Sequence, residues 1–112
     1  MEESRLKTGI WVKAMLRQAG QTGNPGMVLH RGDEDAGSVL IVLLGRDRRM
    51  CVLAPTRTPD GRRAWFRATG ETAVDQDSVD AYVARQRERD PDIWVLEFDA
   101  PDLKPPFEAR LI

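Results

Sequence analysis

The densest group of chemically active side chains falls in one short loop. His30 and Arg31 open it, and Asp33, Glu34 and Asp35 follow. Carboxylates beside an imidazole can ligate a hard cation or place a general base, so a small enzyme or a metal-dependent site is one hypothesis. The loop lacks the length and alternating ligands of a calcium-binding loop. A turn in which Asp33 caps its own backbone is the simpler interpretation. We predict no metal and no cofactor, and keep Arg31 and the three carboxylates as a candidate functional loop.

A second group of polar residues is rich in arginine and runs from Arg46 to Arg67. Seven arginines in this stretch accompany only two acidic residues, and Trp65 and Phe66 lie among them. Base stacking and phosphate contacts use such side chains, so an RNA- or nucleotide-binding module is another hypothesis. The formal charge of the whole chain is −1, which gives no general attraction to nucleic acid. A charged strand face in solvent explains the arginines more simply, and we expect no nucleic acid partner.

Two tryptophans and an arginine form a candidate binding surface: Trp65, Arg67 and Trp94. Aromatic residues and arginine are enriched in protein interfaces. A core position is the competing interpretation for each tryptophan. The single cysteine, Cys51, is predicted to be a buried, unreactive thiol, because no cation is evident on its face of the predicted strand.

Length and composition indicate one folded domain. The chain has 112 residues, of which 41% are hydrophobic and 31% charged, as is typical of globular proteins. One cysteine allows no internal disulfide, which fits a reducing compartment. No signal peptide and no run of about 18 apolar residues for a membrane span is evident. We expect a soluble cytoplasmic protein without a membrane partner, in which residues 1–112 form one domain with a proline-rich tail from about residue 100.

The hydrophobic pattern predicts two helices and five strands. The helices span 9–19, with Thr8 as N-cap, and 75–89, with Asp75 as N-cap. The strands span 27–31, 39–44, 49–54, 63–68 and 93–98. Because the first four strands are short and separated by turns, they favour an antiparallel meander. The expected fold is therefore α+β, with a mainly antiparallel five-stranded sheet and two helices in the order α-β-β-β-β-α-β.

Strand 39–44 is apolar on both of its faces. Both sets of side chains need cover, because large exposed apolar patches are rare on monomers. The two helices can cover one face each. Alternatively, both helices lie on one face and a second copy of the chain covers the other. The wide apolar stripe of each helix favours the second arrangement, so we expect a homodimer through the sheet.

Three blocks of sequence resemble a known family when taken in order: residues 5–12, residues 31–37, and residues 79–83 followed by 90–97. They are similar to the domain of unknown function 1491, a family of short bacterial proteins, over about residues 5–44 and 74–98. The resemblance implies a small cytosolic bacterial domain. Since the family has no assigned activity, the resemblance transfers no catalytic residue to this chain.

Searches for established catalytic patterns find none. The sequence has no phosphate-binding loop, dinucleotide fingerprint, nucleophile elbow or zinc-ligand spacing. We therefore predict a non-enzymatic binding or interaction module. The enzyme or metal site around His30 and the RNA- or nucleotide-binding module of Arg46 to Arg67 remain as alternatives.

Overall fold

The computed structural model, which describes residues 6–112, contains two α-helices, five strands and one short 3₁₀ turn. In chain order these are α1 (Thr8–Gln21), β1 (Gly26–His30), β2 (Val39–Leu44), η1 (Arg46–Arg48), β3 (Met50–Arg57), β4 (Arg63–Arg67), α2 (Gln76–Arg89) and β5 (Trp94–Asp99). The predicted α+β class and the order α-β-β-β-β-α-β are confirmed. Neither of the two described helices is long and apolar enough to cross a membrane.

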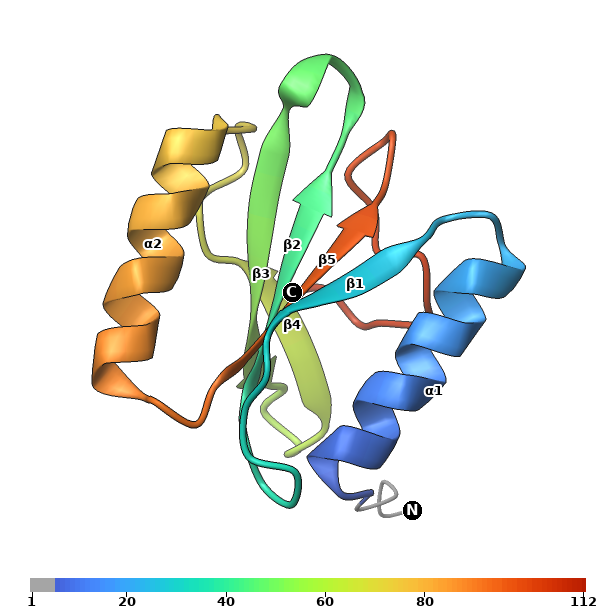
Figure 1. Ribbon diagram of the computed structural model, residues 1–112, viewed down its shortest axis with the longest axis vertical. Coiled ribbons are helices and arrows are strands. Elements are labelled where there is room, and N and C mark those ends of the chain that lie inside the picture. Colours follow the sequence, from blue (N-terminus) through green and yellow to red (C-terminus); the bar gives the residue numbers. More distant parts are fainter. Residues whose placement is uncertain (1–5) are drawn as a thin grey trace.

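The five strands form one sheet in the order β1-β5-β2-β3-β4 (Figure 1). Three neighbouring pairs are antiparallel, but β5 runs parallel to β2, so the sheet is mixed. The predicted meander is wrong for β1, which pairs with β5 instead of β2. The reason is burial. Four of the six residues of β5 are buried, whereas β1 has three exposed residues in its middle, so the centre of the sheet suits β5 and the edge suits β1.

Each face of the sheet is covered by a different helix, and the two helices flank the sheet in Figure 1. On one face, Ile41 and Leu43 pack in a cluster with Val12 of α1. On the other, Val42 packs in a cluster with Val79 of α2. The expectation that both helices share one face is therefore wrong, and the bare sheet face that motivated a homodimer is absent from the described part of the chain.

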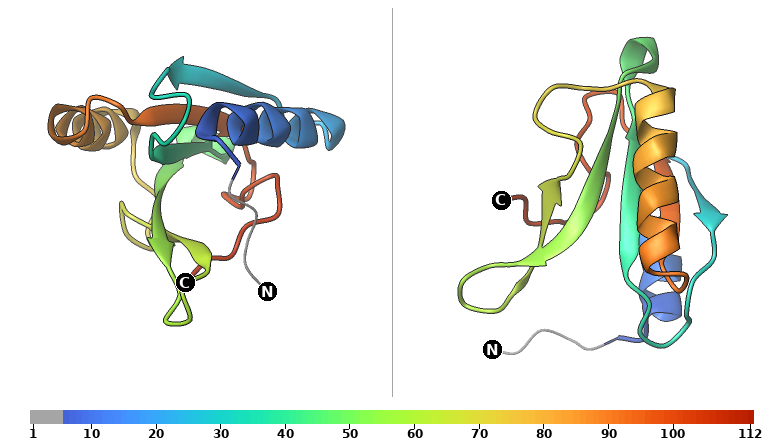
Figure 2. Two further views of the ribbon diagram at one scale, coloured as in Figure 1. Left: turned by 90° about the horizontal axis from the view of Figure 1, so that it is seen from below. Right: turned by 90° about the vertical axis from the view of Figure 1, so that its left-hand side faces the viewer.

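The proline-rich tail, residues 100–112, packs beside α1 on the same face of the sheet. Phe107 is buried, with its ring centroid 5.3 Å from that of Phe98 and 6.0 Å from that of Trp11. At the end of the tail, Trp65 N donates to Arg110 O at 2.8 Å, and Ile112 N donates to Trp65 O at 2.9 Å. The tail thus passes from β5 across the α1 side to the outer edge of β4 (Figure 2).

Helix α2 begins as its sequence predicts. The Asp75 carboxylate accepts a hydrogen bond from Ser78 N at 2.9 Å, which confirms Asp75 as the N-cap. Hydrogen bonds from Ser78 hold the pKa of Asp75 below its usual value. Val79 and Val83 then bury one face of the helix against the sheet. Local capping and a short apolar stripe are enough to position this helix.

Candidate functional site

A cleft of about 1060 Å³ opens on the α1 side of the molecule. Three segments that are distant in sequence line it. They are the start of α1 with Thr8 and Trp11, the acidic loop (residues 31–37) with Asp35 to Gly37, and the β3–β4 hairpin from Pro55 to Trp65. In this cleft the described residues bring charged and aromatic side chains together.

The backbone of the acidic loop forms the cap of α1. Gly9 N donates to Glu34 O at 2.8 Å, and Thr8 N donates to Asp35 O at 3.2 Å. Thr8 is the first helical residue, not the predicted N-cap, and its hydroxyl donates to Gly37 O at 2.8 Å. Lys7, the observed N-cap, makes no side-chain capping bond. Because loop carbonyls accept these first donors, the start of α1 is closed by the protein itself.

The side chains of the acidic loop point to different partners. Asp33 Oδ2 accepts from Ala36 N at 2.8 Å, Glu34 pairs with Arg31, and Asp35 lies 3.6 Å from Lys7 Nζ. The carbonyl oxygen of Asp33 also accepts a hydrogen bond from Trp94 Nε1 at 2.8 Å, which fixes the loop on the start of β5. Among residues 6–112, no group of three or more ligating side chains converges on a point that could hold a metal ion.

His30 precedes this loop and faces a different element. Its Nε2 lies 3.4 Å from a terminal nitrogen of Arg87 on α2. Burial lowers the pKa of His30, and the positive charge of Arg87 lowers it further. The structure therefore does not bring His30 together with Asp33 or Asp35, as a shared metal or acid–base site would require.

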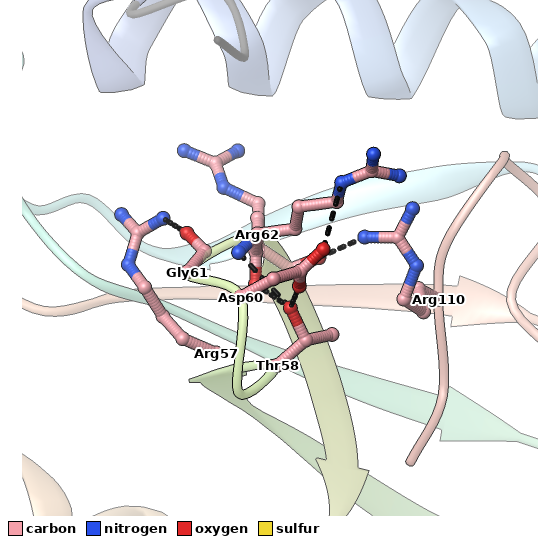
Figure 3. A network of polar contacts seen from close by, with 7 residues as sticks. Arg57, Thr58, Asp60, Gly61, Arg62 and Arg110 are labelled. Atoms are coloured by element: carbon pink, nitrogen blue, oxygen red, sulfur yellow. Dashed lines mark hydrogen bonds and ion pairs between the residues drawn. The ribbon is translucent and has the colours of Figure 1, made fainter. Parts of the chain in front are cut away.

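The hairpin wall of the cleft holds an ordered group of charges at the β3–β4 turn, residues 58–62 (Figure 3). Arg57 donates to Gly61 O at 2.8 Å, and Arg62 Nε lies 3.3 Å from Asp60 Oδ2. The hydrogen bond from Thr58 holds the pKa of Asp60 below its usual value, and the charges of Arg62 and Arg110 add to this effect. Asp60 is therefore an anion that organises the cations around it.

The aromatic part of the cleft joins α1 to β4. The rings of Trp11 and Trp65 stack with centroids 5.8 Å apart and planes inclined by 26°. The guanidinium carbon of Arg63 lies 5.2 Å from the centre of the Trp11 ring, in a cation–π arrangement. Trp65 is buried, whereas Trp11 is half-buried and keeps part of its surface in the cleft.

The predicted binding surface of Trp65, Arg67 and Trp94 is not assembled as one exposed patch. The two tryptophans are only 4% and 3% exposed, on strands separated by β2 and β3, because burying such large rings stabilises the core. Arg67 turns inward, where it donates to Cys51 Sγ at 3.3 Å and to Leu103 O at 3.0 Å. The expectation that Cys51 has no cation on its face is therefore wrong. Burial nevertheless raises the pKa of this thiol, against the opposing effect of Arg67.

The arginines of residues 46–67 separate into three places. Arg46, Arg48 and Arg49 lie around η1, Arg67 points into the structure, and the remaining three line the cleft: Arg57, Arg62 and Arg63. Sequence reasoning missed the contribution of Arg110, which lies in the tail and donates to Arg63 O at 3.3 Å. It also missed Trp11 as a partner of this group. Both join the hairpin only through long-range packing, which no local pattern of the sequence reveals.

Comparisons with known proteins were consistent with this architecture. The family model described as protein of unknown function (DUF1491) matches residues 6–108. A crystal structure of a DUF1491 family protein from Caulobacter crescentus is 30% identical, with a TM-score of 0.84 over 96% of this chain and 99% of that chain. An NMR structure from the same organism gives 30% identity and a TM-score of 0.82 over 98% of this chain and 99% of that one.

A solution structure of a protein from A. tumefaciens shares the fold, with 23% identity and a TM-score of 0.79 over 95% of each chain. No match was found among functionally curated proteins. The comparisons therefore establish family and fold, and the chemistry of the cleft carries any statement about ligands.

Proposed function

The chain belongs to the DUF1491 family, and we propose that it is a non-enzymatic binding module that takes an anionic small molecule in the cleft. The single observation that supports this function is the grouping of three guanidinium groups along the hairpin wall of the cleft, on Arg57, Arg62 and Arg63, around Asp60, whose pKa the charge of Arg110 also lowers. Three arginines against two carboxylates, Asp35 and Asp60, leave the lining of the cleft with a net positive charge.

The arginines are held in place before any ligand arrives. Arg57 is fixed by a backbone carbonyl, Arg62 by a carboxylate, and Arg63 by the ring of Trp11. Fixed guanidinium groups lose less freedom on binding an oxyanion than mobile lysines do. Because protein surrounds the cleft on several sides, the electrostatic field of the arginines is stronger there than it would be on an open surface. These features favour binding of a small anion.

In this proposal the binding unit is the whole chain, as one domain. Helix α1 supplies Trp11, the hairpin supplies three arginines, and the tail holds the hairpin through the bond from Arg110 to Arg63 O. The acidic loop with Arg31 and its three carboxylates takes a structural role, in which backbone carbonyls of Glu34 and Asp35 cap α1 and that of Asp33 anchors the start of β5. The hairpin then binds the ligand, and the neighbouring acidic loop stabilises the fold.

Titration followed by NMR of the ¹⁵N-labelled protein tests this function. Inorganic phosphate and citrate, added at low ionic strength, are expected to shift amide signals of residues 8–11 and 55–63. The double variant Arg57→Gln/Arg62→Gln should weaken binding at least about tenfold, because it removes two charge-assisted contacts. Arg49→Gln removes one exposed charge next to the far end of β3 and serves as the control. If neither anion shifts these signals at millimolar concentration, the proposed function is wrong.

A further inference from the structure

We propose that the ligand of the cleft is a nucleoside monophosphate or a close chemical relative, in which a phosphate group is joined to a flat ring. This inference rests on the proposed function and names the class of ligand for the same site. Three properties of the cleft support it: its size, the donors on its hairpin wall, and the apolar surface beside that wall.

The size of the cleft leaves room for more than a simple anion. Its volume is about 1060 Å³, and pockets that enclose drug-sized ligands measure roughly 300–1,000 Å³. A single phosphate ion bound by the hairpin would leave most of this space to water. A ligand with an anionic end and a larger body uses both the charged wall and the rest of the cleft.

The hairpin wall matches a phosphate group. A guanidinium group is planar and can donate two parallel hydrogen bonds to a phosphate, with donors to spare. Arg57 is anchored through one terminal nitrogen and Arg62 through Nε, so each keeps further N–H groups for a ligand. Two such groups, one at the end of β3 and one in the β3–β4 turn, suit a phosphate because its terminal oxygens can be shared between them.

The surface beside the arginines matches a flat ring. Leu6, Trp11 and Pro55 line the cleft with apolar atoms, and Leu6 is 46% exposed, so covering it removes apolar surface from water. Arg63 lines the same cleft while its guanidinium lies over Trp11. Nucleic acid bases stack on guanidinium planes and on aromatic rings, so a base beside Arg63 extends a stack that is already present in the protein.

A mononucleotide fits better than an RNA chain because the positive surface does not continue. The arginines around η1 are separated from Arg57 by the full length of β3, an eight-residue strand. Arg67 is directed toward Cys51 and Leu103, away from a shared surface. Asp35 and Asp60 are part of the cleft lining. A polyanion would meet these carboxylates along its length, whereas a ligand with one phosphate needs only the guanidinium groups of Arg57 and Arg62.

Isothermal titration calorimetry of the full chain with AMP, adenosine and inorganic phosphate tests the inference. AMP should bind at least about tenfold more tightly than phosphate, and adenosine more weakly than AMP, because only AMP uses both parts of the cleft. Arg57→Gln/Arg62→Gln should weaken AMP and phosphate alike, by about tenfold or more. Leu6→Ala should weaken AMP by about threefold and leave phosphate unchanged. Arg49→Gln should change neither.

The outcomes separate this inference from the function on which it rests. Equal affinities for AMP and phosphate, or binding of citrate without AMP, would overturn the nucleotide assignment and leave the anion-binding function standing. AMP binding that persists in the double arginine variant would show that the nucleotide lies elsewhere. Failure of phosphate, citrate and AMP together would overturn both proposals. A single-stranded oligonucleotide that binds far more tightly than AMP, and that Arg49→Gln also weakens, would replace the mononucleotide with RNA.

Discussion

The acidic loop and the β3–β4 turn line the same cleft, yet they use their polar side chains in opposite ways. In the acidic loop, Asp33 caps Ala36, Glu34 pairs with Arg31, and loop carbonyls cap α1. In the β3–β4 turn, Asp60 organises guanidinium groups that face the cleft. The segment with the most reactive-looking sequence is thus the more structural one, because the bonds that a side chain already makes decide what chemistry it can still offer.

The largest expected effect lies in the acidic loop, at Gly32. A methyl group on its Cα would overlap the carbonyl oxygen of Asp92 and lie 2.6 Å from Trp94 Cδ1. Gly32→Ala must therefore push the loop off the start of β5, and we expect the free energy of unfolding to fall by about 2–4 kcal/mol. Urea unfolding followed by circular dichroism measures this change. Gly20→Ala in α1 is the control, because a methyl group there would meet no other part of the protein within 4 Å. This variant should be neutral or mildly stabilising.

A loss below about 0.5 kcal/mol in Gly32→Ala would show that the loop can move without cost. The structural role assigned to the acidic loop would then be wrong, and its carboxylates would again be candidates for a functional site. The same measurement therefore tests one side of the comparison directly.

The next effect is smaller and concerns two of the three carboxylates of the loop. Asp33→Ala removes the acceptor for Ala36 N, and losses of such local caps cost about 0.5–2 kcal/mol. Asp35→Ala removes only an exposed pair with Lys7, so its cost should stay below about 0.5 kcal/mol. Calorimetric titration with magnesium, calcium, manganese and zinc should show no stoichiometric binding. Binding that Asp33→Ala abolishes would revive the metal-site hypothesis.

Local patterns predicted much of this fold, and long-range packing decided the rest. The Asp75 cap and the apolar stripe at Val79 and Val83 identify α2 from sequence, because capping and helical periodicity are short-range properties. The place of β5 between β1 and β2 was not predicted. Parallel pairing joins strands that are far apart in sequence, and turn spacing carries no information about it.

The candidate site shows the same division between near and distant residues. The arginine-rich stretch was recognised from sequence, and three of its arginines do line the cleft. Its partners Trp11 and Arg110 were missed, since one lies on α1 and the other in the tail. Trp65 and Trp94 were grouped as a surface because sequence gives residue types without burial, and both lie in the core.

On the hairpin side, Asp60→Asn should strengthen anion binding, because it removes the negative charge among the guanidinium groups. Phosphate affinity at pH 7 is expected to rise by about threefold, a modest change because these charges are exposed and screened by salt. Asp47→Asn, which removes an equal charge at η1, is the matched control and should leave the affinity unchanged. A fall in affinity would instead mean that Asp60 is needed to hold Arg62 in its binding position.

The smallest expected effect is a difference in pH dependence between the two regions. Burial and Arg87 lower the pKa of His30 in the folded protein below its usual value of 6.5. Between the folded pKa and 6.5 the unfolded chain therefore binds more protons, so stability is full above pH 6.5 and falls slightly as the pH drops through this window. His30→Gln should remove this decrease in the free energy of unfolding, as measured by urea unfolding between pH 5 and 8. Asp60, whose pKa is lowered, stays ionised across this range, so Asp60→Asn should leave the slope as it is in the parent. A slope that survives His30→Gln would mean that another group senses the pH.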